Sequence, residues 1–371
     1  MVFLIFVLIL SVLIVVHEAG HFFTAKKMGV RVEQFALGFG PKLFSRVWEG
    51  TEYCLCAIPL GGYVKMAGDD RTQCKGVSDE YFSKSIGHRS WIILMGPIVN
   101  YIFAYLCFVI VFMIGYVDME ATNKAVPAKV EQVVVESAAE KAGVKQGDQI
   151  MAIDGTSIGS WGEMQEKVSH SAGKELQFSL MRDGEIKTLL VTPQLRTTKD
   201  IFGREKQVGQ IGVQQGKIDS PDKLVIRKYS FVASLGQAAG ELGKITGKTY
   251  SSLWEIITGQ RSAKEGMTGL IGIFFIIKFA VAIGLSFLLH VVGIISASLA
   301  IFNLLPIIPL DGGHLFLLGL EKMRGRALSL KTDELMAKVG FAFIIVLAAF
   351  VFYVDFERIG LIDRVVHFLK G

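Results

Sequence analysis

Four long apolar stretches punctuate the chain, at about residues 2–25, 90–116, 285–305 and 339–354. A helix needs about 20 mostly apolar residues to cross a hydrocarbon core of about 30 Å. The pattern therefore predicts an α-helical polytopic membrane protein with about four transmembrane helices. The first stretch has no basic residue before it and no small-residue cleavage pattern after it, so we expect a retained span rather than a signal peptide.

Two further segments are apolar or show helical periodicity, but neither is expected to be a simple transmembrane helix. Residues 270–283 would extend only about 20 Å as a helix, so we expect them to be tilted or interfacial. Residues 221–266 show helical periodicity with scattered Trp and Ile, which is typical of a helix on the outer membrane surface. A generic linker also explains this second segment.

The polar segment 26–89 follows the first span. Its Gly and Pro residues separate short β-prone pieces, which predicts hairpins or a small sheet at the membrane edge. This segment and the loop 321–338 are both rich in Lys and Arg, and short cytoplasmic loops carry an excess of these residues. We therefore expect both to be cytoplasmic, with the N-terminus and the residues after the second span outside.

Residues 126–193 have the composition of a soluble α+β domain. Expected strands at 130–135 and 149–153 flank the segment 137–148, S-A-A-E-K-A-G-V-K-Q-G-D, and Asp154-Gly155 forms a turn. This order is similar to that of a bacterial PDZ domain, with Ala138 in place of the usual Pro. PDZ domains bind extended peptide ends by strand addition, so a peptide ligand is implied. The alternative is a domain that binds no peptide and only blocks access to a site within the membrane or keeps other proteins at a distance from it.

Composition supports a membrane protein. Hydrophobic residues make up 51% of the 371 positions, and the mean hydropathy is +0.46. The net charge of +5 is modest and is explained by loop charges that set orientation, not by nucleic-acid binding. Cys54 and Cys56 lie two apart, so the spacing predicts reduced thiols in a cytosolic loop rather than a redox or zinc-ribbon pair.

Candidate chemistry begins inside the first span, with the sequence His17-Glu18-Ala19-Gly20-His21. Residues four apart share a helix face, so both imidazoles can face one metal ion, and Glu18 can reach a water bound there. This is the H-E-x-x-H pattern of zinc hydrolases. Because ionisable groups are costly inside a bilayer, the placement indicates function rather than packing.

A catalytic zinc ion usually takes three protein ligands and one water. The segment 303–314, N-L-L-P-I-I-P-L-D-G-G-H, combines polar groups with two helix-breaking prolines beside the third span. Broken backbone at membrane depth is tolerated where protein covers it or a water-filled cavity lies next to it. Asp311 and His314 are the two candidates for the third ligand.

Four features in this order together resemble the site-2 protease family of intramembrane zinc metalloproteases, and within it the bacterial regulator of sigma-E protease type. They are H-E-A-G-H, the segment 95–100 (M-G-P-I-V-N), the external PDZ-like domain and N-x-x-P-x-x-P-L-D-G-G-H. The resemblance implies that Asp311 is the third ligand of one Zn²⁺ ion and that Asn303 positions the substrate or the oxyanion. It also implies that Gly38-Phe39-Gly40 and the strand 58–66 pair with an unwound substrate, near Gly61, Gly62 and Tyr63.

The resemblance further implies an enzyme of the bacterial inner membrane with its active site toward the cytoplasm and Glu18 as its catalytic base. Single-span membrane proteins, such as anti-sigma factors or remnant signal peptides, would be its substrates. Two departures are a single PDZ-like module and M-T-G-L at 267–270 in place of S-G-P. The chain then divides into 1–116 (two spans and their loop), 126–193 (PDZ-like domain), 194–283 (linker and surface helix) and 284–371 (two spans and tail).

Two other classes of protein remain as alternatives. A membrane scaffold could bind peptides through the PDZ-like domain and keep a vestigial metal site, but it need not retain Glu18 and all three ligand candidates. A zinc transporter could place His and Asp in its spans, but it needs further polar residues along a pathway across the membrane. Such residues are scarce in these spans.

Overall fold

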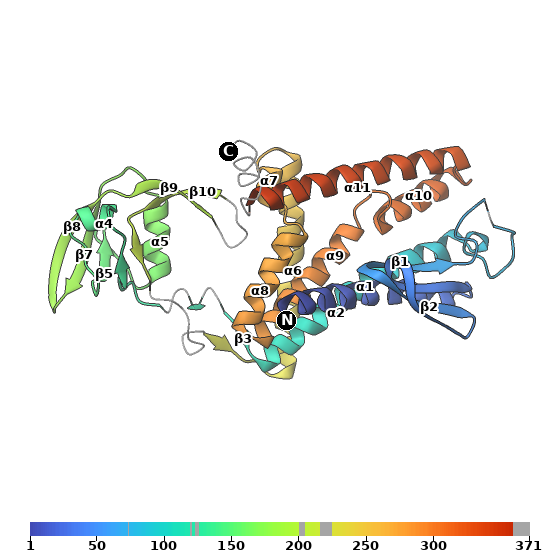
Figure 1. The fold of residues 1–371 in the computed structure, drawn as a ribbon, viewed down its shortest axis with the longest axis horizontal. Coiled ribbons are helices and arrows are strands. Elements are labelled where there is room, and N and C mark those ends of the chain that lie inside the picture. Colours follow the sequence, from blue (N-terminus) through green and yellow to red (C-terminus); the bar gives the residue numbers. More distant parts are fainter. Residues whose placement is uncertain (73, 119–120, 123–125, 200–204, 216–224, 359–371) are drawn as a thin grey trace. The chain divides into compact units, whose positions relative to one another are not determined.

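The computed structural model describes residues 1–72, 74–118, 121–122, 126–199, 205–215 and 225–358 (Figure 1). The chain forms two compact units. The first combines Met1–Ile114 with Tyr229–Glu357, and the second contains Gly115–Lys228. The second unit is therefore an insertion between the helices of the first.

Four helices of the first unit are long and apolar enough to cross a membrane, as the apolar pattern predicts. They are α1 (Val2–Lys27), α2 (Ile86–Ile114), α9 (Leu285–Asn303) and α11 (Leu330–Arg358). The remaining helices of this unit are α6 (Phe231–Ile257), α7 (Ala263–Gly266), α8 (Leu270–Ile283) and α10 (Asp311–Arg324). The helical membrane architecture is thus confirmed.

The region 321–338 differs from the expected loop. α10 continues to Arg324, Gly325 ends it in the left-handed region at φ 66°, and α11 already begins at Leu330. Basic residues indicate the side of the membrane but not the backbone conformation, and Lys, Leu, Glu and Ala are strong helix formers. Only five residues therefore separate the two helices.

The helix α6 packs against the membrane-spanning helices rather than forming a free linker. The Tyr101 hydroxyl of α2 shares a hydrogen bond with Thr246, and the Tyr105 hydroxyl donates to the Leu235 carbonyl. Figure 1 shows α6 crossing the direction of α1 and α2. A second tie joins the end of α11 to the start of α8, where the buried Asp355 carboxylate accepts three backbone N–H groups, those of Gly269, Ile271 and Gly272.

The polar segment between α1 and α2 folds into the predicted small sheet. The strands β1 (Val32–Trp48) and β2 (Thr51–Met66) are antiparallel and both bend, so residues 34–37 pair on one side with 62–65 and on the other with 52–55. Gly38 and Gly40 have φ near +88° and +86° at the bend. Residues 62–66 therefore form an edge strand.

The loop that follows β2 is fixed by Glu80. Its carboxylate accepts hydrogen bonds from the Cys74 thiol and from the backbone N–H groups of residues 75–77. These bonds, of which that from Cys74 has the largest effect, lower the pKa of Glu80 below its ordinary value. The short 3-10 helix η1 (Tyr81–Ser83) then places Tyr81 in a core with Phe22 and Ile92. The loop is thus anchored to both α1 and α2.

The second unit is built on a four-stranded antiparallel sheet in the order β6-β5-β7-β8. Its core includes Val130, Ile150, Ile153, Phe178 and Leu180. The elements of the unit are β3 (Tyr116–Val117), β4 (Gln132–Val133), α4 (Ala138–Lys141), β5 (Gln149–Ile153), β6 (Thr156–Ser157), α5 (Trp161–Ser169), β7 (Leu176–Arg182), β8 (Glu185–Val191), β9 (Gln194–Lys199), β10 (Glu205–Gln210), β11 (Val213–Gln214) and β12 (Ile226–Arg227).

The expected strand 149–153 is present as β5, whereas the expected strand 130–135 is reduced to the two residues of β4. The unit also extends beyond 126–193. β11 pairs with β4, Ile211 lies in the core, and β12 pairs with β3. The pairing of β12 with β3 places the first and last strands of the unit side by side.

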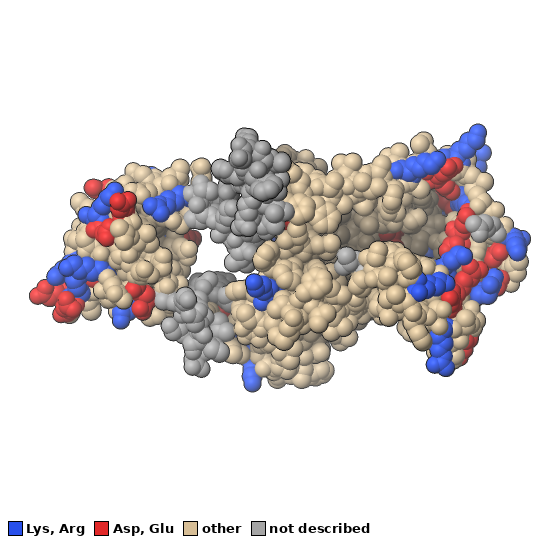
Figure 2. Space-filling model, in the orientation of Figure 1, with Lys and Arg blue, Asp and Glu red and all other residues tan. Residues whose placement is uncertain are grey.

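Charged side chains are unevenly placed on the first unit. Figure 2 shows Lys, Arg, Asp and Glu gathered at the end where β1, β2, the loop after them and the adjoining ends of α10 and α11 lie, whereas the rest of the helical part carries few on this face. A wide uncharged zone around helices is what a bilayer requires, because charges are costly at that depth.

Candidate metal centre

The first helix and the second approach closely at glycines. A side-chain carbon on Gly20 would meet the carbonyl of Met95, and one on Gly96 would meet the ring of His21. The absence of side chains at both positions lets the α1 backbone and the His21 ring lie directly on α2. His17 and His21 are consequently buried on the same face of α1.

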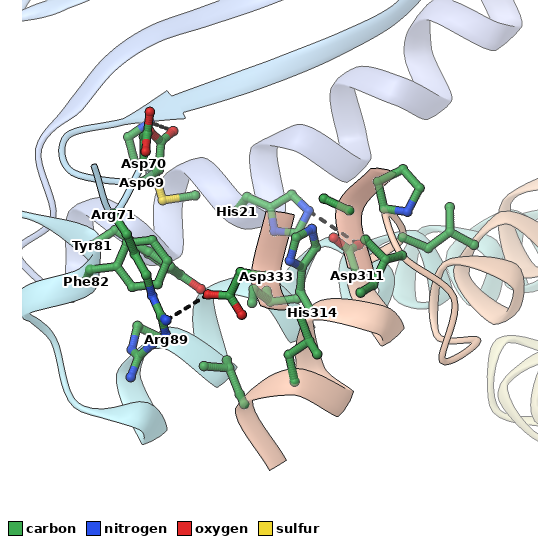
Figure 3. Close-up of a pocket in the computed structure, with 18 of the residues that line it drawn as sticks. His21, Asp69, Asp70, Arg71, Tyr81, Phe82, Arg89, Asp311, His314 and Asp333 are labelled. Carbon is green, nitrogen blue, oxygen red and sulfur yellow. Dashed lines mark hydrogen bonds and ion pairs between the residues drawn. The ribbon is translucent and has the colours of Figure 1, made fainter. Parts of the chain in front are cut away.

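The third element reaches the same place through a break in the helices. α9 ends at Asn303, and α10 begins at Asp311, with Pro306 and Pro309 between them. Gly312 and Gly313 allow α10 to lie against the backbone of Leu304 and Ile307. This packing holds Asp311, the first residue of α10, with its carboxylate toward α1 (Figure 3).

Three ligand atoms converge at this point. Oδ2 of Asp311 lies 3.2 Å from Nε2 of His17 and 3.5 Å from Nε2 of His21, and the two Nε2 atoms are 3.3 Å apart. A tetrahedral zinc ion with bonds of about 2.0–2.1 Å holds its ligand atoms about 3.4 Å apart. The triangle therefore has the size that one zinc ion needs.

The protonation of His21 supports the same interpretation. Its Nδ1 lies 2.9 Å from the carbonyl oxygen of Ile92, which can only accept, so Nδ1 carries the proton. In the neutral ring Nε2 then presents a lone pair to the other two atoms. Oδ2 of Asp311 is buried and has no hydrogen-bond partner among the described residues. A cation would stabilise these electron-rich atoms, so the donor set fits a divalent metal.

The three candidate ligand residues line a cavity of about 880 Å³. Glu18, Asn303 and His314 line it as well, and so do Gly62 and Tyr63 of the edge strand. Gly62 lies close to the Glu18 side chain. The cavity therefore brings the candidate base, the three candidate ligands and a sheet edge together.

Gly61, predicted near the substrate, and His314, the alternative third ligand, lie outside the group formed by the three candidate ligands and the cavity-lining edge strand. Gly61 does not line the cavity; its φ is +133°, and the ring of Phe39 occupies the space a side chain would need. His314 lies beside Asp311 in Figure 3 but is exposed, and its nitrogen atoms are not part of the ligand group that the described residues form.

Sequence reasoning missed a charged cluster on the other side of the cavity. Glu321 of α10 receives hydrogen bonds from Arg89 (2.6 Å) and Arg71 (3.2 Å), and Arg71 also reaches Asp333 of α11 (2.7 Å). The ring of Phe82 lies against both guanidinium groups. No spacing in the sequence indicates this cluster, because its members come from four separate segments.

Asn100 was also missed as a site residue. The motif 95–100 contains Asn100 but assigns it no role. Its side chain is fully buried and lies 3.3 Å from Nδ1 of His17. A polar residue in the middle of a span is a signal that could have identified it.

Comparison with known proteins adds an independent line of information. A family model described as peptidase family M50 matches residues 5–347. An inferred zinc metalloprotease of Mesorhizobium japonicum is 31% identical over 364 residues, which cover 94% of this chain and 97% of that protein. One from Clostridium acetobutylicum is 32% identical over 344 residues, covering 92% and 93%.

The regulator of sigma-E protease RseP of Escherichia coli is 28% identical in an alignment of 449 residues, covering 95% of this chain and 98% of that protein. This alignment is longer than the 371 residues of the chain, so the Escherichia coli protein contains segments that have no counterpart here.

Proposed function

The chain belongs to peptidase family M50, the site-2 protease family, and is a zinc metalloprotease; we propose that it hydrolyses peptide bonds within the transmembrane segments of single-span membrane proteins. The observation that supports this most directly is the triangle of ligand atoms from His17, His21 and Asp311 beside Glu18. Both histidines and Glu18 lie on α1, a helix long enough to span a bilayer. We assign one Zn²⁺ ion to these three ligands.

Each residue of the site has a part in the proposed reaction. A bound zinc ion would activate a water molecule and polarise the scissile carbonyl. Glu18 accepts the proton of the attacking water and returns it to the leaving amine. Asn303, at the end of α9, can donate its amide N–H to the substrate or to the developing oxyanion.

Substrate binding is the proposed part of the edge strand. A helical substrate hides its amide bonds within its own hydrogen bonds, so it has to unwind before hydrolysis. An extended peptide can add to a free sheet edge by backbone pairing. Residues 62–66 offer such an edge at the cavity, with Gly62 and Tyr63 lining it, and Gly61 contributes the backbone bend that precedes it.

The proposed topology follows from the basic loops. We place the N-terminus and the inserted unit outside the cytoplasm, and β1, β2 and the metal centre toward the cytoplasmic side of a bacterial inner membrane. The inserted unit is proposed as a PDZ-like domain that binds peptide ends or controls access. An anti-sigma factor or a remnant signal peptide is a suitable substrate class, and the Escherichia coli relative is named a regulator of sigma-E.

Cleavage of a defined substrate tests this function. Purified full-length protein is incubated with several single-span peptides, with and without a zinc chelator, and the fragments are mapped by mass. We expect a cut inside the apolar segment that the chelator abolishes and added zinc restores. Peptide binding without any cut under all zinc conditions would instead support the scaffold. Zinc flux across proteoliposomes without a cut would support the transporter.

A further inference from the structure

The two candidate histidine ligands differ in the group that contacts the Nδ1 atom of each ring. Nδ1 of His21 lies against a backbone carbonyl, which can only accept a hydrogen bond. Nδ1 of His17 lies 3.3 Å from the side-chain amide of Asn100, which offers both a donor and an acceptor. The state of His17 therefore depends on which end of that amide faces it.

The amide of Asn100 is held in a fully buried place. Its side chain is 0% exposed, and its main-chain carbonyl accepts a hydrogen bond from Ser296 of α9 at 2.8 Å. As placed, Nδ2 faces His17 and Oδ1 has no hydrogen-bond partner among the described residues. Rotating the amide by about 180° exchanges the two atoms with little change in shape.

Two neutral forms of His17 make opposite demands on this amide. With the proton on Nε2, which faces Asp311, Nδ1 is an acceptor and Nδ2 of Asn100 can donate to it. To bind a metal through Nε2, the ring must instead carry its proton on Nδ1, which then needs an acceptor. Among the described residues, Asn100 is the one with a side-chain hydrogen-bonding contact to this nitrogen, so its Oδ1 can supply the acceptor once the amide turns.

We propose that Asn100 is a positioning residue for the metal centre, which accepts the Nδ1 proton of His17 in the zinc-loaded protein and so directs the Nε2 lone pair to the ion. The proton count is unchanged when the amide turns: Nε2 loses one proton, Nδ1 gains one, and the ring stays neutral. This inference rests on the proposed function, because it takes His17 as a zinc ligand.

Zinc affinity of full-length variants in detergent tests the proposal. Asn100→Leu keeps the number of side-chain heavy atoms and the branch at Cγ but removes the acceptor, and Asn100→Asp keeps an acceptor. Loss of a hydrogen-bond partner behind a metal ligand typically costs 10–100-fold in affinity. We expect that loss in Asn100→Leu, with Asn100→Asp within about threefold of the unchanged chain. Ser296→Ala, which alters only the contact with the Asn100 backbone, is the matched control and should bind zinc normally.

Two spectroscopic measurements distinguish positioning from packing. Co²⁺ bound in place of zinc should give an altered visible absorption spectrum in Asn100→Leu and not in Asn100→Asp. In zinc-loaded protein labelled with ¹⁵N-histidine, His17 should carry an Nδ1 proton that is hydrogen-bonded in the unchanged chain, and this hydrogen bond should be lost in Asn100→Leu.

Equal losses in the Leu and Asp variants would overturn the proposal, and so would normal zinc affinity in both. Failure of the unchanged chain to bind zinc would overturn the proposed function, and this inference with it. Zinc binding by the unchanged chain and its loss in His17→Ala, together with a normal Asn100→Leu, would refute the inference alone.

Discussion

Arg89 at the start of α2 and Glu321 on α10 form a short ion pair, 2.6 Å between the nitrogen and oxygen atoms, with the side chain of Arg89 only 5% exposed. The pair joins the helix that supports the histidines to the helix that begins at Asp311. Both residues line the cavity, so the ion pair holds α2 and α10 together beside the candidate metal centre.

Replacing Glu321 by Gln should destabilise the protein markedly. The change leaves the buried charge of Arg89 without its partner, which typically costs about 3–5 kcal/mol. Thermal unfolding of the detergent-solubilised protein is the measurement. Glu334→Gln is the control, because Glu334 and Lys338 form an exposed pair one turn apart and their loss should have little effect. Equal unfolding temperatures for both variants would contradict the assigned role of Glu321.

Gly96→Ala should abolish zinc binding. The added carbon would meet the His21 ring and the edge of the His17 ring, so α1 or the rings must move. Zinc content after dialysis is the measurement. Gly87→Ala on the same helix is the control, since Gly87 is exposed and the added carbon would lie 3.9 Å from Oγ of Ser85, an ordinary contact distance. That control should retain zinc and gain up to about 1 kcal/mol of helix stability.

Glu18→Gln should bind zinc but fail to cut. The amide keeps the size of the side chain and cannot accept a proton, so a rate loss of about 10²–10⁴-fold is expected for a missing general base. Zinc content and cleavage of a single-span substrate are measured on the same sample. A Gln variant that cuts at the unchanged rate would show that another group accepts the proton.

Asp311→Ala should lower zinc affinity far more than His314→Ala. Asp311 supplies one corner of the ligand triangle, whereas His314 is exposed and outside it. Competition with a chelator measures both affinities. The reverse order would make His314 the third ligand and would leave Asp311 as its neighbour.

The inserted unit should lose stability at acidic pH through Asp148. Burial alone would raise the pKa of this carboxyl group, but the hydrogen bonds from Arg182 and from the Lys145 N–H outweigh it, so the pKa is below its ordinary value. Because the folded pKa is depressed, this contribution is present above the ordinary pKa of about 3.9 and is lost as the pH falls through the folded pKa.

Hydrogen exchange of β5 and β7 in the full chain, at pH 6 and near pH 3, measures this loss. Asp148→Asn should be less protected at pH 6 and should change less between the two pH values. A variant whose protection falls with pH as steeply as that of the unchanged chain would exclude Asp148 as the cause.

The sequence allowed the spans, the small sheet and the ligand candidates to be predicted because each has a local signal. Apolar length locates α1, α2 and α9, and the four-residue spacing places His17 and His21 on one helix face. What it did not reveal depends on contacts between distant segments. The cluster around Glu321 and the contact of Asn100 with His17 are of this kind. The helix at residues 330–338 does have a local signal in its strong helix formers, but the excess of basic residues there favours a loop.

The three proposed ligands come from opposite ends of the polypeptide, with the whole inserted unit between them. During synthesis, the ribosome must therefore complete more than four-fifths of the chain before residue 311 emerges and the cage can close. A nascent or prematurely terminated product would carry the paired imidazoles without their carboxylate. With these three ligands, metal-dependent hydrolysis therefore has to wait until the inserted unit and the helices on both sides of it have been synthesised.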